Sequence, residues 1–274
     1  MQHTREELLA RVEKNGVHCE EEDIWDIDFE AFRKAFTPKT RLFILNSPHN
    51  PTGKVFSQEE LNRMAEVLKE FPDVVVVEDN VYYGLLYDDL QGKELPKLSK
   101  MESMANRTLS VYSAGKMFSA TGVKVGWVIG NESLMVPIRA VHQQTTDCLY
   151  NPIENTISRS LELISDPKNG YLRECSERLS NSRRALVMAL LKSKYDIDLW
   201  VPQGGYFILG DISKVVVMEK YMQDKEGKPL TKDWAFAFQT AYEDHVTCIP
   251  CTPFYAPEHA ELGKNFVRFA FCHS

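Results

Sequence analysis

The sequence lacks several features that would assign a protein quickly to a class. It has no apolar run long enough to cross a membrane, so no membrane partner is expected. Acidic residues outnumber basic ones by 39 to 32, and the net charge of −7 argues against nucleic acid as a main partner. The six cysteines are scattered, which favours reduced thiols over a disulfide framework. What remains is a globular chain of 274 residues, enough for one large core or two modest ones.

Metal and redox sites are also poorly represented. The seven histidines show no metal-ligand spacing, and we expect no metal. Cys248 and Cys251 have the spacing of a redox motif, but they lie in an apolar stretch with no second cysteine pair. We therefore interpret them as part of a structural strand end, ahead of a redox or zinc site. His49 is the one histidine within a motif, and we expect it to orient a turn.

The most informative segment is residues 113–127, SAGKMFSATGVKVGW, which follows an apolar run. It places Lys116 among small residues at a predicted strand end, with Ser113 three positions before it and Lys124 eight after it. A lysine on such a turn can lose hydration, which makes its amine nucleophilic enough for a Schiff base. The hydroxyls of Ser113 and Ser119 and the charge of Lys124 suit a phosphate dianion. An aldehyde cofactor with a phosphate meets both demands, and pyridoxal phosphate is the usual one. For this segment alone, a solvated loop lysine is the alternative.

A second motif, PHNPTG at residues 48–53, follows the apolar run 41–45, which we predict to be a buried strand. Its two prolines and its glycine predict a rigid turn at the carboxyl end of that strand, and an X–Pro bond here is a candidate cis peptide. Such a turn would hold the amide of Asn50 where it can donate to a phenolate oxygen. An ordinary turn is the alternative.

A third motif, VVVVEDNVY at residues 74–82, predicts a parallel strand buried on both faces and ending in acidic residues. A carboxylate at that position, Asp79, can pair with a protonated pyridine nitrogen, and Tyr82 can hydrogen-bond the oxygen of the same ring. A helix cap is the alternative role for Asp79.

A fourth motif, NFVRFAF at residues 265–271, places Arg268 within an otherwise apolar strand. Burying an arginine is costly unless its guanidinium meets an anion. The planar fork matches an α-carboxylate in a bidentate way, so Arg268 is a candidate for binding the substrate. Pairing with a structural Asp or Glu is the alternative.

Taken together and in this chain order, the four motifs resemble the fold-type I pyridoxal-phosphate aminotransferases of class I/II. The details are most similar to the branch of kynurenine aminotransferase and glutamine transaminase K. Residues 141–144, 202–207 and 249–250 also resemble that branch, and the resemblance runs from about Trp25 to Phe271.

The resemblance implies a role for each candidate. Lys116 would carry the Schiff base and move a proton between substrate and cofactor. Asp79 would pair with the pyridine nitrogen, and Asn50 and Tyr82 would contact the ring oxygen. Ser113 and Lys124 would hold the phosphate, and Arg268 would bind the substrate carboxylate.

Two departures from the family pattern stand out. Asn80 replaces the acid that relatives carry beside the ring. Residues 1–22 supply none of the amino-terminal arm, phosphate loop and ring-stacking aromatic of the family, and instead predict one charged helix that ends at Asn15-Gly16. The chain also ends just after the Arg268 strand, before the family's last helix. We therefore expect a chain truncated at both ends.

The predicted fold class is α/β, with a mostly parallel sheet sandwiched by helices and a smaller α+β domain. Ser57 and Glu60 form a capping-box pattern that opens a helix, and strands and helices then alternate as parallel sheets require. The break at residues 166–170 places the boundary, so that residues 1–170 form the cofactor-binding domain and 171–274 the smaller one.

The predicted function is transfer of an amino group from a kynurenine, glutamine or aromatic amino acid to a 2-oxo acid. The alternatives are a non-catalytic truncated homologue and a cysteine-conjugate β-lyase using the same site. The resemblance implies a homodimer. We expect a cytoplasmic protein, with a mitochondrial one left open because the natural amino terminus is expected to be missing.

Overall fold

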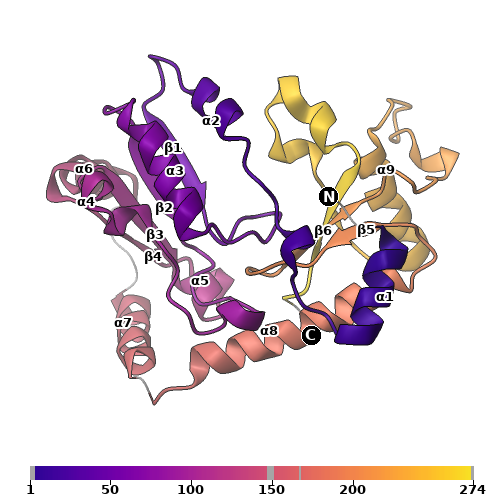
Figure 1. Ribbon diagram of the computed structural model, residues 1–274, viewed down its shortest axis with the longest axis horizontal. Coiled ribbons are helices and arrows are strands. Elements are labelled where there is room, and N and C mark those ends of the chain that lie inside the picture. Colours follow the sequence, from indigo (N-terminus) through magenta and orange to yellow (C-terminus); the bar gives the residue numbers. More distant parts are fainter. Residues whose placement is uncertain (1–3, 147–150, 167, 273–274) are drawn as a thin grey trace. The chain divides into compact units, whose positions relative to one another are not determined.

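The computed structural model describes residues 4–146, 151–166 and 168–272. The chain forms two compact units (Figure 1). One unit, here called the parallel-sheet unit, consists of residues 26–50 and 54–177. The other, here called the antiparallel-sheet unit, consists of residues 1–25, 51–53 and 178–274.

The parallel-sheet unit contains a four-stranded sheet in the order β1-β2-β3-β4. β1 (Leu42–Asn46), β2 (Val75–Asp79) and β3 (Thr108–Ser113) run parallel, and β4 (Gly126–Ile129) pairs antiparallel with β3. The sequence-based prediction of a mostly parallel sheet is confirmed, as are its strands to within one or two residues. β4 follows β3 through residues 114–125, whose α-helix is only four residues long, and it returns antiparallel beside β3.

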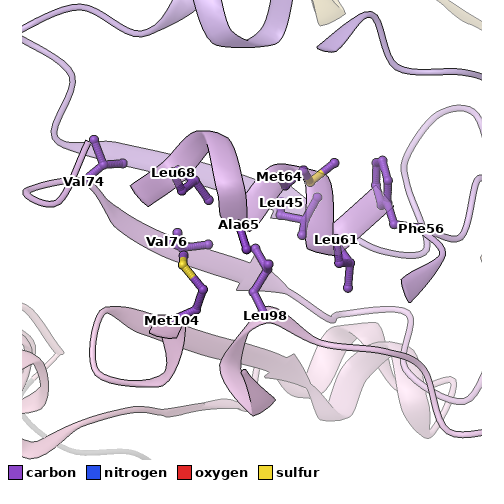
Figure 2. Close-up of a cluster of buried hydrophobic side chains, with 10 residues drawn as sticks. All are labelled: Leu45, Phe56, Leu61, Met64, Ala65, Leu68, Val74, Val76, Leu98 and Met104. Atoms are coloured by element: carbon purple, nitrogen blue, oxygen red, sulfur yellow. The ribbon is translucent and has the colours of Figure 1, made fainter. Parts of the chain in front are cut away.

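The main core of this unit lies between the sheet and helix α3, Gln58–Lys69. The predicted capping box is present. The Ser57 side chain accepts from the Glu60 amide, and the Glu60 carboxylate accepts from the Ser57 amide. Figure 2 shows the buried stripe of α3 meeting β1 and β2. That stripe consists of Leu61, Met64, Ala65 and Leu68, each at most 4 % exposed. Burying each large side chain contributes roughly 1.5–3 kcal/mol.

The described residues of this unit form five further α-helices, of which the sequence predicted only one. They are α2 (Phe29–Ala35), α4 (Glu102–Ala105), α5 (Ala114–Met117), α6 (Glu132–Thr146) and α7 (Asn151–Ser165). The predicted helix from about residue 133 corresponds to α6, but its expected path through residues 147–150 lies outside the described residues. α2 was missed because its seven residues give only a short apolar period, and α7 was not separated from the helix predicted from about residue 133.

The face of the sheet opposite α3 carries exposed apolar side chains. Along β1, Phe43 and Leu45 turn toward the core, and Leu42 and Ile44 alternate with them at 51 % and 59 % exposure. β1 is therefore apolar on both faces, which is the pattern of a strand that is covered on both sides.

The antiparallel-sheet unit contains a second four-stranded sheet in the order β5-β6-β8-β7. Its strands are β5 (Asp198–Trp200), β6 (Phe207–Asp211), β7 (Ile249–Pro250) and β8 (Phe266–Ala270), all paired antiparallel. α9 (Lys232–Gln239) belongs to this unit, and α8 (Tyr171–Leu191) enters it at Arg178. β5 was missed because three residues are too few for a periodic signal.

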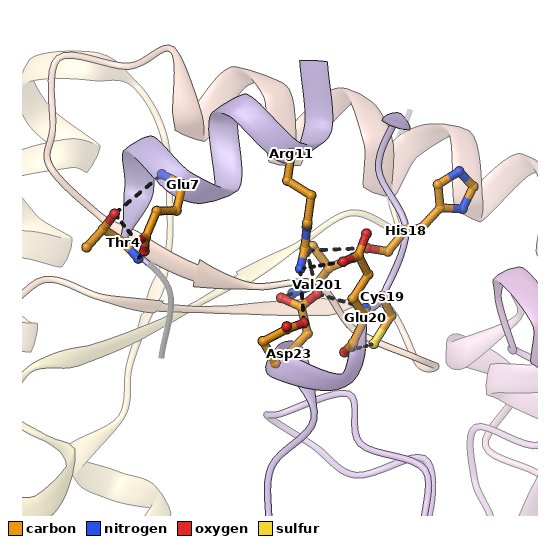
Figure 3. Close-up of polar contacts among 9 residues, drawn as sticks. Thr4, Glu7, Arg11, His18, Cys19, Glu20, Asp23 and Val201 are labelled. Carbon is orange, nitrogen blue, oxygen red and sulfur yellow. Dashed lines mark hydrogen bonds and ion pairs between the residues drawn. The ribbon is translucent and has the colours of Figure 1, made fainter. Parts of the chain in front are cut away.

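Helix α1, Arg5–Asn15, also belongs to this unit and confirms the charged helix predicted near the amino end. The Arg5 guanidinium donates to the carbonyls of Leu191 and Ser193 at 2.7 Å each. In Figure 3, Arg11 meets the carboxylate of Asp23 at 2.5 Å, and Asp23 also accepts from the Val201 amide at 3.1 Å. These long-range bonds tie the first 25 residues to the C-terminal part of the chain.

The two compact units therefore differ from the predicted division into residues 1–170 and 171–274. The C-terminal unit begins at Arg178, and it takes in residues 1–25 and 51–53 as well. The reason is physical, because backbone and arginine bonds over nearly two hundred positions leave no compositional trace along the chain. A linear boundary drawn at a sequence break misses such contacts.

Two further absences hold for the part of the chain that the structure describes. Within it, no helix is both long enough and apolar enough to cross a membrane. No group of three or more potential metal ligands is found among the same residues.

Adjacent acids on β2 point to opposite faces, and Glu78 is the one turned toward the core. It is 3 % exposed and accepts from the Leu98 amide, from the Ser99 amide at 3.2 Å and hydroxyl at 2.6 Å, and from the Ser110 hydroxyl at 2.9 Å. This carboxylate fastens the segment around Leu98 to the sheet.

We predict that Glu78→Ala lowers the free energy of unfolding by about 3 kcal/mol, because it strands several buried donors at ~1–3 kcal/mol each. Glu78→Gln should cost less, since one oxygen remains to accept from the two amides. Urea denaturation gives the difference, with Glu66→Ala on the exposed face of α3 as the control, expected within ~0.5 kcal/mol of wild type. An equally mild effect of Glu78→Ala would contradict the assigned role.

Candidate functional site

The carboxyl ends of β1, β2 and β3 lie along one edge of the parallel sheet. The register pairs Asn46 with Asp79, and Asp79 with Val111. Because side chains alternate, Ser113 shares the face of Val111, two residues on. Asp79 and Ser113 therefore occupy the same face at the same edge, where parallel sheets bind ligands.

Asn46 joins two of the predicted motifs and was not given a role from the sequence. Its side-chain amide donates to the Asp79 carbonyl at 2.9 Å, and its side-chain oxygen accepts from the Asn50 amide at 2.7 Å. The Ser47 amide also donates to the Asp79 carbonyl at 3.2 Å. The turn that carries Asn50 is thus fastened to the strand that carries Asp79. The signal was present, since a polar residue ends an apolar strand.

The turn itself has the predicted form. The Ser47–Pro48 peptide bond is cis, which confirms that expectation. Gly53 at its end has a φ of +70° and belongs to the antiparallel-sheet unit. Its carbonyl accepts from the amides of Gln203 and Gly204, and a Cβ at Gly53 would lie 2.2 Å from the Pro202 Cβ. Two motifs far apart in the sequence meet here, and a side chain at position 53 would prevent it.

Asp79 is the acid of β2 that faces away from the α3 core. Its Oδ1 accepts from the Val81 amide at 3.3 Å. Burial raises the pKa of the Asp79 carboxyl above its usual value, and the Val81 bond offsets only part of that effect. A half-buried carboxylate of this kind is stabilised by any cation placed beside it.

Two residues of the turn that follows Asp79, Asn80 and Tyr82, are buried. Asn80 is 5 % exposed, and its side chain donates to the Glu78 carbonyl at 3.1 Å, so the residue that departs from the family pattern supports the backbone. Tyr82 is also 5 % exposed and lies in the turn after β2. Its predicted contact with a ring oxygen remains a prediction.

Lys116 lies on α5, directly after β3. Ala114, Gly115 and Met117 on this short helix are buried, whereas Lys116 is half-buried. A Cβ on Gly115 would lie 3.0 Å from the Thr121 Cα and 3.5 Å from the Ser113 Oγ. Glycine at this position therefore permits the close approach of the Thr121 backbone, and a Cβ would meet the Ser113 hydroxyl only in ordinary contact.

Ser113 and Lys124, the predicted phosphate ligands, lie on neighbouring segments. Ser113 pairs with Gly126 across β3 and β4, and the Ala114 amide donates to the Val125 carbonyl at 3.0 Å. Lys124 is exposed and has a φ of 58° in the left-handed region. The chain reverses its direction at residues 119–124, and Lys124 therefore lies close to the end of β3 at Ser113.

Six of the seven predicted site residues belong to the parallel-sheet unit, and Arg268 belongs to the other. Arg268 lies on β8, and its Cζ is 4.0 Å from the ring centroid of Phe207 and 5.1 Å from that of Phe254. These aromatic contacts were not foreseen from the sequence. They offer a cation a favourable surface within an apolar strand.

The remaining candidate groups are consistent with structural roles. Burial raises the pKa of Cys248 to about 11 and that of Cys251 to about 12, so both thiols stay protonated and unreactive. No disulfide joins the cysteines among the described residues, namely Cys19, Cys175, Cys248, Cys251 and Cys272, and Cys148 lies outside those residues. Burial, with the charge of Lys54 beside it, lowers the pKa of His49 below its ordinary value.

Comparison with known proteins points in one direction. The family described as aminotransferase class I and II matches residues 2–274. Kynurenine–oxoglutarate transaminase of Dictyostelium discoideum is 37 % identical over 259 residues, which cover 90 % of this chain and 56 % of that protein. Kynurenine–oxoglutarate transaminase 1 of Rattus norvegicus is 31 % identical over 90 % of this chain and 57 % of its own length.

Solved structures give the same picture. Bna3p of Saccharomyces cerevisiae, a putative kynurenine aminotransferase, is similar with a TM-score of 0.75 and 32 % identity, covering 90 % of this chain and 57 % of that one. N-succinyldiaminopimelate aminotransferase of Mycobacterium tuberculosis has a TM-score of 0.76 and 30 % identity, covering 95 % and 63 %. The chain thus spans a little more than half the length of these relatives.

We predict that Asp79→Asn stabilises the cofactor-free protein at pH 7, by an amount on the order of 2 °C in Tm. The folded-state pKa of Asp79 lies above the ordinary 3.8, so the folded carboxylate costs stability once pH exceeds that value. The gain should vanish below pH 3.8, where the group is protonated in both states. Thermal unfolding across pH, with exposed Asp73→Asn as the control, measures it. A destabilised variant at pH 7 would contradict the assignment.

We also predict that the free energy of unfolding decreases as the pH is lowered below about 6.5. His49 contributes to this decrease because its folded-state pKa is lower than its unfolded-state pKa of 6.5. The unfolded chain then binds a proton that the folded chain does not. His49→Gln should flatten this part of the pH dependence, whereas exposed His259→Gln should leave it unchanged. The test is to measure unfolding free energies between about pH 7.5 and about pH 5, the range in which histidine titrates.

Proposed function

Since this chain belongs to the aminotransferase class I and II family, we propose that its whole protein transfers amino groups with pyridoxal phosphate held on Lys116. One observation carries the proposal. Three parallel strands end at one edge, with Asp79 and Ser113 on one face there and Lys116 on the helix that follows. The chain spans 56 % of the length of the Dictyostelium relative, so the proposal concerns the whole protein.

The residues present fit this cofactor. Burial has raised the pKa of Asp79, so a protonated pyridine nitrogen would relieve a carboxylate that is costly to ionise. The Ser113 hydroxyl lies at the end of β3, and Lys124 supplies a cation two residues before Gly126, the β4 partner of Ser113. When bound, the ring would act as the electron sink for bonds broken at the substrate Cα.

The protein residues then have separate tasks. Lys116 supplies the primary amine for attachment and, once released, a base that moves a proton at the substrate Cα. Asn50, held by Asn46, would donate to the ring oxygen and keep the ring plane fixed. Tyr82 would contact the same oxygen. Arg268 would bind the substrate carboxylate through its planar fork.

For the substrate, we propose a kynurenine, glutamine or aromatic amino acid as donor and a 2-oxo acid as acceptor. The support is similarity to proteins named kynurenine–oxoglutarate transaminases. β-Elimination from a cysteine conjugate is the competing reaction at the same site, and a non-catalytic homologue is the competing protein class. Homodimer formation is part of the proposal and is tested by sedimentation.

We predict that borohydride reduction in the presence of pyridoxal phosphate labels Lys116 and that Lys116→Ala abolishes labelling. Mass spectrometry of peptides locates the label. Lys69→Ala, an exposed α3 lysine paired with Glu66, is the control and should label like wild type. Labelling that survives in Lys116→Ala would remove the basis of the proposal.

Product analysis distinguishes the reactions. Conversion of the cofactor to its amine form with kynurenine or glutamine supports amino transfer, and release of ammonia and pyruvate from a cysteine conjugate supports the lyase. Labelling of Lys116 with neither reaction supports the non-catalytic homologue.

A further inference from the structure

Two aromatic rings contact Arg268, and they reach it from separate elements of the antiparallel-sheet unit. Phe207 comes from β6, where Leu209 is the direct partner of Arg268. Phe207 is thus a diagonal neighbour on the same face, with its ring centroid 4.0 Å from the Arg268 Cζ. Phe254 comes from the short 3₁₀ turn Thr252–Phe254, and its centroid is 5.1 Å away.

The turn that carries Phe254 is anchored on its far side by α9. The Asp233 carboxylate, fully buried, accepts from the Thr252 amide at 2.8 Å. The Trp234 indole donates to the Thr252 hydroxyl at 3.1 Å. Gly263 packs its backbone directly against the turn, since a Cβ there would lie 2.6 Å from the Cys251 carbonyl oxygen. Phe254 is 39 % exposed, yet its backbone is held firmly.

We propose that Phe207 and Phe254 are positioning residues for Arg268. A guanidinium donates hydrogen bonds only in its own plane, and its faces are weakly hydrated, so aromatic rings suit the faces and leave the edge to an anion. Two rings from fixed elements restrict how the fork tilts. This inference rests on the proposed function, in which Arg268 binds a substrate carboxylate, and it adds the residues that orient the fork.

The test removes one aromatic face and keeps the apolar volume. Phe254→Leu should weaken binding of a carboxylate about three- to tenfold, the range expected for a partly exposed cation–π contact. Phe254→Tyr keeps the face and should stay within about twofold of wild type. Phe238→Leu, on α9 at 38 % exposure, is the matched control and should have no effect. If Phe254→Leu fails to fold by circular dichroism, Phe254→Met replaces it.

The probe is 3-phenylpropionate, titrated into the cofactor-free protein. The readout is the Arg268 Nε–H resonance, assigned through Arg268→Lys. Unchanged affinity in the Leu variant, equal losses in the Phe254 and Phe238 variants, or failure of wild type to bind the probe would each overturn the inference.

Labelling of Lys116 by the cofactor tests the proposed function separately from the role of Phe254. Labelling of Lys116 should be the same in wild type and in Phe254→Leu. In turnover assays the Leu variant should raise KM for the amino acid with kcat little changed, because the lost contact orients a binding group. Absent Lys116 labelling with normal probe binding would refute the proposed function and leave the role of Phe254 standing.

Discussion

The period-two alternation of β2 is the constraint on which the rest of the parallel-sheet unit depends. It sends Glu78 to one face and Asp79 to the other, although the two acids are adjacent in the chain. Glu78 satisfies four donors on the core side and fixes the segment that follows Leu98. Asp79 is thereby directed to the opposite face at the strand end, beside the backbone that Asn46 holds. One face fastens the strand and the other carries the candidate chemistry.

Much of this unit could be predicted from the sequence because its signals are local. The Ser57 capping box, the inward stripe of α3 and the runs of β-branched residues depend on neighbours within a few positions. The candidate residues could be placed at strand ends for the same reason. The role of Glu78 escaped because its partners lie 20 to 32 positions away, and only the fold brings those partners near. The grouping of α1 with the C-terminal residues depends on still longer separations.

Arg268 shows how a correct physical premise can leave the structural answer open. The cost of an arginine in an apolar strand led to the expectation of an anion or of a structural acid. The aromatic rings of Phe207 and Phe254 offer a third way to reduce that cost, since they accommodate a cation without neutralising it. A ring over the face of a guanidinium leaves its positive charge in place, whereas pairing with a carboxylate would neutralise it.

The exposed apolar side chains of β1 lie on the face of the sheet opposite α3. Leu42 and Ile44 lie on the face that Asp79 shares, because the register sets Leu42 opposite Val75 and Ile44 opposite Val77. Exposed apolar side chains of this size are stabilised by burial against another element. The relatives extend well beyond the length that this chain spans, so their folds contain elements with no counterpart among these 274 residues. Burial on that face would further desolvate Asp79, which raises the cost of its charge and strengthens its preference for a cation beside it. Under the proposed function, covering this face of the sheet would therefore also favour a protonated ring beside Asp79.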